Sequence, residues 1–202
     1  MQTKLNVDFC NYEAAKFAVL NWHYSKRMPT CKTVKFGVWE NNRFIGAVIF
    51  GDGANNNLGK PYGLKSTEIC ELVRIALTTH KSPVTQIVSL ARKKLKTFTP
   101  FLRLIVSFAD SEQGHLGIIY QAGNWIYTGQ TKPADEYIVN GKRFHGRAIR
   151  STKPKGMPIK QYLKNQGSYR KIKGSVKYRY LYPLDKKMRK QVIQLSVPYL
   201  KQ

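Results

Sequence analysis

Acidic residues are scarce in this 202-residue sequence, which holds 11 Asp and Glu against 35 Lys and Arg and carries a net charge of +24. An excess of that size opposes compaction through self-repulsion, so folding does not explain it. A polyanionic partner does, and nucleic acid is the commonest one. An anionic membrane surface is the weaker alternative, because no basic amphipathic helix with a clean apolar face stands out.

Cysteine and long apolar runs are also lacking. The sequence has three cysteines, Cys10, Cys31 and Cys70. Their odd number and wide spacing do not indicate a disulfide framework or a zinc ribbon. No stretch of about 18 apolar residues occurs, and the first 20 residues lack the layout of a signal peptide. We expect a cytoplasmic protein with reduced cysteines and no membrane partner. The four histidines show no ligand spacing with the cysteines, so no metal site is predicted.

The cations are concentrated in the last third of the chain. Residues 142–202 hold 18 Lys and Arg against the single acid Asp185, whereas residues 1–141 hold 17 against 10. A hydrophobic content of 42% is enough for a folded core. We therefore expect one domain overall, in which residues 1–141 form the core and residues 142–202 form a basic nucleic-acid-binding extension packed on it.

The spacing of apolar residues predicts helices alternating with strands. For the helix at residues 82–98, Ser82 is the expected N-cap and Pro83 the first helical residue. The Gly- and Asn-rich residues 52–66 are predicted to be a loop. This order predicts an α/β fold with a mixed central sheet flanked by helices. The other expected helices are 12–22, 112–123 and a short one within 185–200, and the expected strands are a hairpin at 34–53 turning at 40–43, then 67–77, 101–110, 124–131 and short runs beyond residue 130.

One candidate binding segment is the junction between the strand at 67–77 and the helix that follows. A helix N-terminus after a strand offers free backbone N–H groups and a positive dipole end, which suit a phosphate. His80, Lys81, Ser82 and Val84 are the candidate cofactor-binding residues there. Because the sequence has no P-loop and no Gly-x-Gly-x-x-Gly motif, an ordinary capped helix is the alternative.

A second candidate segment is the end of the apolar strand at 101–110. Asp110 and Ser111 lie where α/β sheets usually place their ligand crevice, and Tyr120 lies near the end of the next predicted helix. A carboxylate there can orient or deprotonate an amine, and a tyrosine can protonate a leaving group. The alternatives are a helix N-cap for Asp110 or Ser111 and core packing for Tyr120.

Aromatic residues accompany basic or titratable ones at two places. His23 lies between Trp22 and Tyr24, where a histidine can transfer protons near neutral pH and aromatic rings can stack on a base, although a structural histidine is the alternative. Further along, cations alternate with rings in a pattern typical of a nucleic-acid surface, with a solvated strand face as the alternative. The candidate nucleic-acid-binding residues are Lys177, Tyr178, Arg179 and Tyr180, together with Lys26, Arg27 and Arg147.

Residues 34–130 resemble the GNAT acyltransferase superfamily. The hairpin, the central strand with its helix, and the segment IIYQAGNW carry the resemblance. It implies a GNAT-like fold in which Tyr120 is the general acid. The junction Thr78–Pro83 departs from the superfamily, because it lacks the glycines of the usual acyl-CoA loop, Arg/Gln-x-x-Gly-x-Gly/Ala.

Nearly the whole chain is similar to the Mom DNA-modification proteins of Mu-like phages. The segments WHYSKRMP, VWENNRFIGAVIFGDGAN, ELVRIAL, SFADSEQGHLGIIYQAGNW and KYRYLYPLD carry the similarity in this order. It implies conversion of adenine in double-stranded DNA to its carbamoylmethyl form, which protects phage DNA from host restriction. It also implies an iron requirement, for which the sequence shows no recognisable site. The catalytic residues it implies are His23, Tyr24, Asp110 and Tyr120, with Arg74 and Ser111.

The sequence does not decide whether the donor of the acyl or glycyl group is acetyl-CoA or glycyl-tRNA. Acetyl transfer attaches a carbonyl carbon to the adenine amine, whereas a carbamoylmethyl group attaches a methylene and ends in an amide. An activated glycyl group supplies those atoms, and tRNA would then be a second nucleic-acid partner. A GNAT-like transferase acting on tRNA or protein amines and a non-catalytic DNA-binding protein are the alternative functions.

Overall fold

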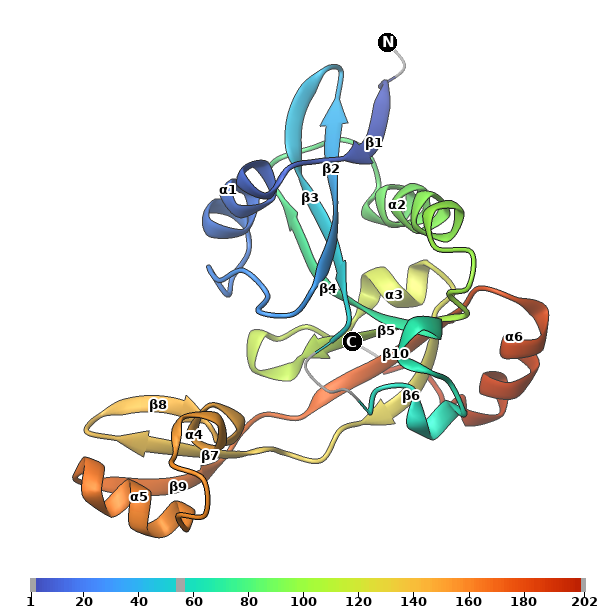
Figure 1. The fold of residues 1–202 in the computed structure, drawn as a ribbon. Helices are drawn as coiled ribbons and strands as arrows, with labels where there is room; N and C mark the ends of the chain where they lie inside the picture. Colours follow the sequence, from blue (N-terminus) through green and yellow to red (C-terminus); the bar gives the residue numbers. More distant parts are fainter. Residues whose placement is uncertain (1–2, 54–56, 201–202) are drawn as a thin grey trace. The chain divides into compact units, whose positions relative to one another are not determined.

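The computed structural model describes residues 3–53 and 57–200. The chain divides into two compact units (Figure 1). Unit 1 comprises Met1–Ala109, Gly117–Gly129 and Arg179–Gln202, and unit 2 comprises Asp110–Leu116 and Gln130–Tyr178. The expected division of one domain into a core at residues 1–141 and a basic extension at 142–202 stays a prediction.

Unit 1 is built on a seven-stranded mixed sheet in the order β1-β2-β3-β4-β5-β10-β6. Strands β1 to β4 pair with one another in antiparallel fashion, and β5 runs parallel to β4. The strands are β1 (Leu5–Phe9), β2 (Thr33–Glu40), β3 (Arg43–Gly51), β4 (Ile69–Leu77), β5 (Leu104–Asp110), β6 (Ile126–Gln130) and β10 (Lys177–Pro183).

Helices α1 (Tyr12–Trp22) and α2 (Val84–Phe98) lie on opposite sides of strands β1 to β4 (Figure 1). The small residues Ala15 and Ala18 of α1 are fully buried, and they let the helix pack closely on Ala47, Ile49 and Ala76 of the sheet. Burial of apolar area of this kind is the main stabilising term in folding. Both faces of this half of the sheet are therefore covered.

The other half of the unit 1 sheet has its own core. Helix α6 (Lys186–Val192) buries Met188 and Val192 against Leu104 and Leu181 of the neighbouring strands β5 and β10. Asp185 caps this helix by accepting from the Met188 N–H and also pairs with Arg103. The short helix α3 (Ile118–Ala122) and the 3-10 turns Lys60–Tyr62, Ser66–Glu68 and Ile193–Leu195 complete unit 1.

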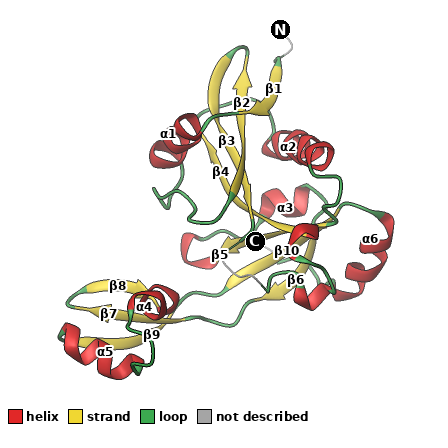
Figure 2. Cartoon of the chain, in the orientation of Figure 1, coloured by secondary structure: helices red, strands yellow, loops and turns green. Residues whose placement is uncertain are grey.

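Unit 2 is a three-stranded antiparallel sheet in the order β8-β7-β9 with two helices (Figure 2). Its apolar core comprises Tyr137 and Val139 of the central strand with Ile149 and Leu163 of the helices. The elements are a 3-10 turn at Ser111–Gln113, β7 (Asp135–Val139), β8 (Lys142–His145), α4 (Gly146–Thr152), α5 (Ile159–Gln166) and β9 (Tyr169–Lys173).

The predicted α/β fold with a mixed sheet is confirmed, and two local expectations about helices are wrong. Helix α2 has Pro83 as its N-cap, because the Ser82 hydroxyl is bonded elsewhere. The helix expected over residues 112–123 covers only Ile118–Ala122, because Gly114 and Gly117 adopt left-handed backbone angles that interrupt it. Strand β1 was not predicted at all. The expected loop at 52–66 contains the 3-10 turn Lys60–Tyr62 and ends at the first residue of a second one, Ser66–Glu68. Its residues 54–56 lie outside the described part of the chain.

Candidate active site

Strands β4 and β5 stop pairing part-way along their length. Their register runs from Ile69 opposite Leu104 to Glu71 opposite Val106, although β4 continues to Leu77 and β5 to Asp110. At the next position, the Ser107 hydroxyl lies 3.0 Å from the Leu72 carbonyl oxygen. A side chain thus takes the place of the next backbone hydrogen bond in the ladder.

The phenol of Tyr120 ends at this same point. Its oxygen lies 2.8 Å from the Ser107 Oγ. Ser107 has one proton, which it donates to the Leu72 carbonyl, so the Tyr120 hydroxyl donates to Ser107. Tyr120 is 8% exposed, and its burial raises the pKa of the phenol to about 12. The group therefore holds its proton at neutral pH, as a general acid must.

Aromatic rings fix the position of Tyr120. The ring centroids of Trp125 and Tyr180 each lie 5.1 Å from its own, and Tyr180 is fully buried. Gly117 permits this packing, because a Cβ there would lie 2.3 Å from the Tyr180 ring. Core packing, the alternative for Tyr120, is therefore observed, and its role as a general acid stays a prediction.

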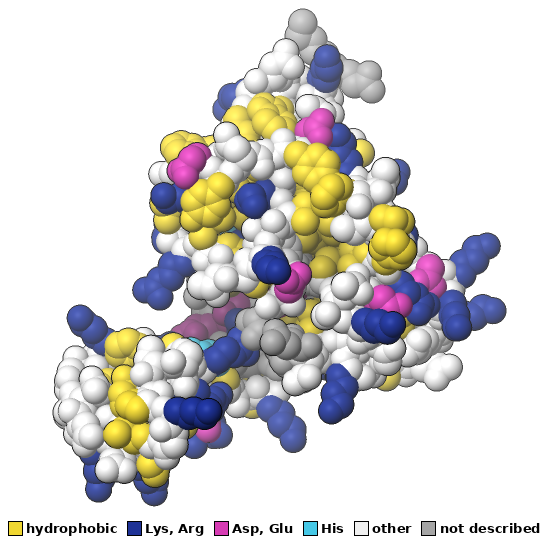
Figure 3. All heavy atoms as spheres, in the orientation of Figure 1, with side chains coloured by type: hydrophobic (Ala, Val, Ile, Leu, Met, Phe, Trp, Pro, Cys, Tyr) yellow, Lys and Arg dark blue, Asp and Glu magenta, His cyan; other side chains and the backbone are white. Residues whose placement is uncertain are grey.

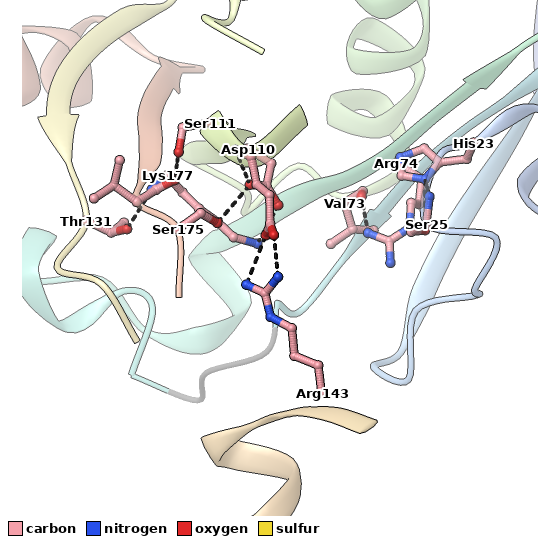
Figure 4. A network of polar contacts seen from close by, with 12 residues as sticks. His23, Ser25, Val73, Arg74, Asp110, Ser111, Thr131, Arg143, Ser175 and Lys177 are labelled. Atoms are coloured by element: carbon pink, nitrogen blue, oxygen red, sulfur yellow. Dashed lines mark hydrogen bonds and ion pairs between the residues drawn. The ribbon is translucent and has the colours of Figure 1, made fainter. Parts of the chain in front are cut away.

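The segment from His23 to Arg27 lies in unit 1 beside β4 (Figure 4). The His23 Nδ1 accepts the Ser25 N–H at 3.1 Å, so in neutral His23 the proton is on Nε2. The His23 ring is buried and lies 4.3 Å from the ring of Tyr24, which is 47% exposed. Tyr24 is close enough to Tyr120 to contribute to the raised pKa of that phenol. The structure thus brings the predicted site residues His23 and Tyr24 into ring contact.

Arg74 supports the same segment from β4. Its Nε and one terminal nitrogen each lie 3.4 Å from the Arg27 carbonyl oxygen, and the other terminal nitrogen donates to the Val73 carbonyl at 2.7 Å (Figure 4). These contacts restrain the chain that carries His23 and Tyr24. In this geometry Arg74 is a positioning residue.

Asp110 belongs to unit 2, where its two carboxylate oxygens have different partners (Figure 4). Oδ1 accepts from the Ser175 hydroxyl at 3.0 Å and from the Glu112 N–H at 3.1 Å, so the N-cap role is observed. Oδ2 lies 3.6 Å from the Lys177 Nζ. Ser111 donates its hydroxyl to the Val176 carbonyl at 2.8 Å. Asp110 is thus held by one oxygen, and its other oxygen faces a cation.

The junction between β4 and α2 already holds an internal anion. Glu40, the last residue of β2, accepts from the N–H groups of Lys81 and Ser82 and from the Ser82 hydroxyl. His80 turns its Nδ1 to the Ser82 carbonyl oxygen at 2.8 Å. Val84 begins the helix. The four candidate cofactor-binding residues are thus adjacent in space, but the amide groups of Lys81 and Ser82 are engaged.

A cleft of about 350 Å³ lies in unit 1 between α2, α3, the two residues that precede β6, and β10. Trp125 and Tyr182 line it, and the Arg92 guanidinium lies 3.3 Å from the centroid of the Tyr182 ring. The Arg92 Nε is buried without a hydrogen-bond partner among the described residues. Burial lowers the pKa of Arg92 to about 10, and the group remains a cation at neutral pH. A desolvated cation beside aromatic rings suits a planar or anionic ligand.

The candidate nucleic-acid-binding residues differ in their burial and in their partners. Arg179 is tied to Thr128 by its guanidinium, Tyr180 lies in the core, and Lys177 pairs with Asp110, whereas Tyr178 is half-buried. Arg147 on α4 and Lys26 and Arg27 are exposed.

Within the described residues, no three His, Cys, Asp or Glu side chains come together as metal ligands. The described residues therefore offer no cluster of such ligands for the iron that the resemblance implies. None of the helices that the structure describes has the length and apolar content needed to cross a bilayer.

Comparison with known proteins identifies the family. Residues 4–201 match the family described as the Mom protein family. The chain belongs to the Mom protein family. It is 25% identical over 193 residues to the protein named "Methylcarbamoylase mom" of Escherichia phage Mu, covering 94% of this chain and 79% of that protein.

Solved structures confirm the predicted GNAT-like fold. The spermidine/spermine N-acetyltransferase SpeG of Vibrio cholerae superimposes with a TM-score of 0.52 at 12% identity, covering 93% of this chain and 96% of that one. A probable GNAT-family acetyltransferase of Chromobacterium violaceum gives 0.51 at 8% identity, covering 89% and 82%.

Four residues with a clear part in these sites were not predicted. Ser107 was hidden in an apolar strand, and Glu40 in a hairpin turn. Arg92 has the spacing of an ordinary helix surface residue, and Ser175 is far from Asp110 in sequence. A lone polar residue within an apolar strand is the one signal that could have indicated Ser107.

The burial of Tyr120 predicts a pH-dependent stability. The folded protein favours the neutral phenol, so this contribution is complete below the unfolded pKa of about 10 and is lost as pH rises toward 12. In urea unfolding between pH 8 and 11, wild type should lose about 1.4 kcal/mol per pH unit above pH 10 relative to Tyr120→Phe. A difference that stays constant with pH would contradict the neutral, buried phenol.

Proposed function

We propose that the protein is a phage DNA-modification enzyme that converts adenine in DNA to its N6-carbamoylmethyl form and so protects phage DNA from restriction. The observation that carries the proposal is the buried, protonated phenol of Tyr120 at the separation of β4 and β5, in a chain of the Mom family. The resemblance to a protein named a methylcarbamoylase and the acyltransferase-like fold support a transferase.

The donor in this proposal is an activated glycyl ester such as glycyl-tRNA. The adenine N6 attacks the glycyl carbonyl carbon, the ester C–O bond breaks, and the leaving oxygen takes a proton. The new free amine then attacks C6 of the purine through a five-membered spiro intermediate. When the bond from C6 to the original nitrogen breaks, that nitrogen becomes the terminal amide, and all atoms of the carbamoylmethyl group are accounted for.

Four of the six predicted catalytic residues have a direct role in this scheme. Tyr120 protonates the leaving oxygen, and Asp110 accepts the amine proton through the oxygen that faces Lys177. His23 carries protons through Nε2. The exposed ring of Tyr24 stacks on an adenine flipped out of the duplex, which costs a few kcal/mol. The aromatic cleft with Arg92 is where we expect the nucleotide end of the donor.

The DNA contact in this proposal is the helical side of unit 2. That unit has 13 Lys and Arg against four Asp and Glu, and all four acids are in ion pairs. Dark blue cations are also frequent on the face seen in Figure 3, where acids are few. Spacings of three and four residues place Arg147 with Arg150, and Lys160 with Lys164, on single helix faces. The cations of unit 2 that have no ion pair within the described part of the chain are Lys132, Lys142, Arg147, Arg150, Lys153, Lys155, Lys160, Lys164 and Arg170.

The function is tested by expressing the protein in a bacterial host and measuring the masses of nucleosides from its total DNA. We expect a deoxyadenosine heavier by one carbamoylmethyl group. Asp110→Asn and Tyr120→Phe should abolish it while leaving DNA affinity within about twofold, because each keeps the size of the side chain. An unmodified adenosine profile from soluble protein would favour the tRNA-modifying or the non-catalytic alternative.

The glycyl route is tested by labelling the exocyclic nitrogen of adenine with ¹⁵N before modification. Because that nitrogen leaves C6 in the rearrangement, the label should appear in the side-chain amide, as fragmentation of the modified nucleoside would show. Label still bonded directly to the purine ring would exclude the rearrangement.

The DNA contact is tested by the salt dependence of duplex binding, measured by fluorescence anisotropy. Arg147→Gln with Arg150→Gln should weaken binding and reduce the slope of log affinity against log salt by about 0.9 for each phosphate that the variant no longer neutralises. Lys186→Gln with Lys187→Gln on α6 makes the same charge change in unit 1 and should leave the slope unchanged. The opposite pattern would move the DNA contact to unit 1.

A further inference from the structure

The β4–α2 junction is the place where the acyl-CoA loop of the resembling superfamily would lie, and its residues do not fit a phosphate. The Glu40 carboxylate accepts from Lys81 N at 3.0 Å and from Ser82 N at 2.8 Å, and the Ser82 hydroxyl donates to it at 2.7 Å. A phosphate bound through the Lys81 and Ser82 amides would need these same donors. A carboxylate from the same chain already satisfies them.

Glu40 is placed to act as a permanent anion. It is 5% exposed, and the hydrogen bond from Ser82 is the main reason that its pKa lies below the usual value. The positive end of the α2 dipole favours the charged form as well. The carboxylate therefore remains ionised at neutral pH, and its charge repels any second anion brought against the same amides.

The tip of the β2–β3 hairpin holds Glu40 in this position. Arg43, its cross-strand partner, donates from its guanidinium to the Thr79 carbonyl at 2.8 Å. The tight turn between them uses Asn41 and Asn42 with left-handed backbone angles, which asparagine tolerates better than most residues. One acidic and one basic side chain of the hairpin thus hold the junction on either side of His80.

We propose that the Glu40 carboxylate occupies the position at the β4–α2 junction where a donor phosphate would otherwise bind. The acyl donor of this protein then binds without placing a phosphate on the Lys81 and Ser82 amides. The pyrophosphate of acetyl-CoA is excluded from that position. The donor is instead an activated acyl ester whose contacts lie elsewhere. This proposal about the donor does not depend on which base the protein modifies.

The proposal is tested by nuclear magnetic resonance on the ¹⁵N-labelled full chain, with CoA and inorganic pyrophosphate as probes. In wild type, the amide resonances of Lys81 and Ser82 should not move at millimolar concentrations of either probe. Glu40→Ala frees both N–H groups and should bind pyrophosphate roughly tenfold or more tightly than wild type, the equivalent of one charged hydrogen bond. The two resonances should then shift saturably.

Glu68→Ala is the matched control, because Glu68 also accepts a backbone N–H in a helical turn, that of Lys65. It should gain no pyrophosphate binding. If Glu40→Ala does not fold, Glu40→Gln removes the charge, keeps one acceptor oxygen and should give a smaller gain. Saturable shifts of Lys81 and Ser82 in wild type with CoA would overturn the proposal, as would a folded Glu40→Ala that gains no binding. If nucleosides are unmodified but CoA moves neither amide, the proposed function fails and this proposal stands.

Discussion

The separation of β4 from β5 is the constraint on which the candidate active site depends. Three residue pairs hold the parallel strands together, and beyond them the strands need other partners for their backbone groups. Ser107 supplies one of these partners by bonding the Leu72 carbonyl, and this places its oxygen where the Tyr120 phenol can reach it. The same hydroxyl therefore closes the ladder and orients the expected general acid.

In each unit, predicted site residues are held by contacts within that unit. Arg74 and Ser25 engage the segment that carries His23, and Ser175 engages one oxygen of Asp110. Such contacts restrict rotamers before any substrate arrives, which is how a protein pre-organises a site. The Tyr24 ring is exposed, and the Arg92 Nε is buried with no hydrogen-bond partner among the described residues.

Acidic and basic side chains of this chain have different surroundings. Acids are few, and the described ones in unit 2 are used in ion pairs, whereas Glu40 is used in place of an external anion. Six of the nine cations that remain lie along α4, α5 and the loop between them, on a unit with a small apolar core. A nucleic-acid partner needs many weak phosphate contacts, and this distribution supplies them.

The local pattern was sufficient to predict α1, the β2–β3 hairpin, β4 and the body of α2, because apolar spacing and turn residues act within a few positions. It also indicated Asp110 and Tyr120 as candidates, since each follows from its place at the end of a strand or helix. It did not predict β1, whose pairing with β2 supplies the evidence for a strand. Nor did it predict the fold of unit 2, whose short strands are stabilised by a core contributed by residues distant in sequence.

Composition and local pattern therefore determined the fold class, the basic charge and the residue types available for chemistry. Only the tertiary structure decided which of those groups are free. It buried Tyr180, bonded Arg179 to Thr128 and directed Glu40 to amides 41 and 42 residues away. The physical reason is that a hydrogen bond or an ion pair depends on distances of about 3 Å, and chain segments far apart in sequence reach such distances only after folding.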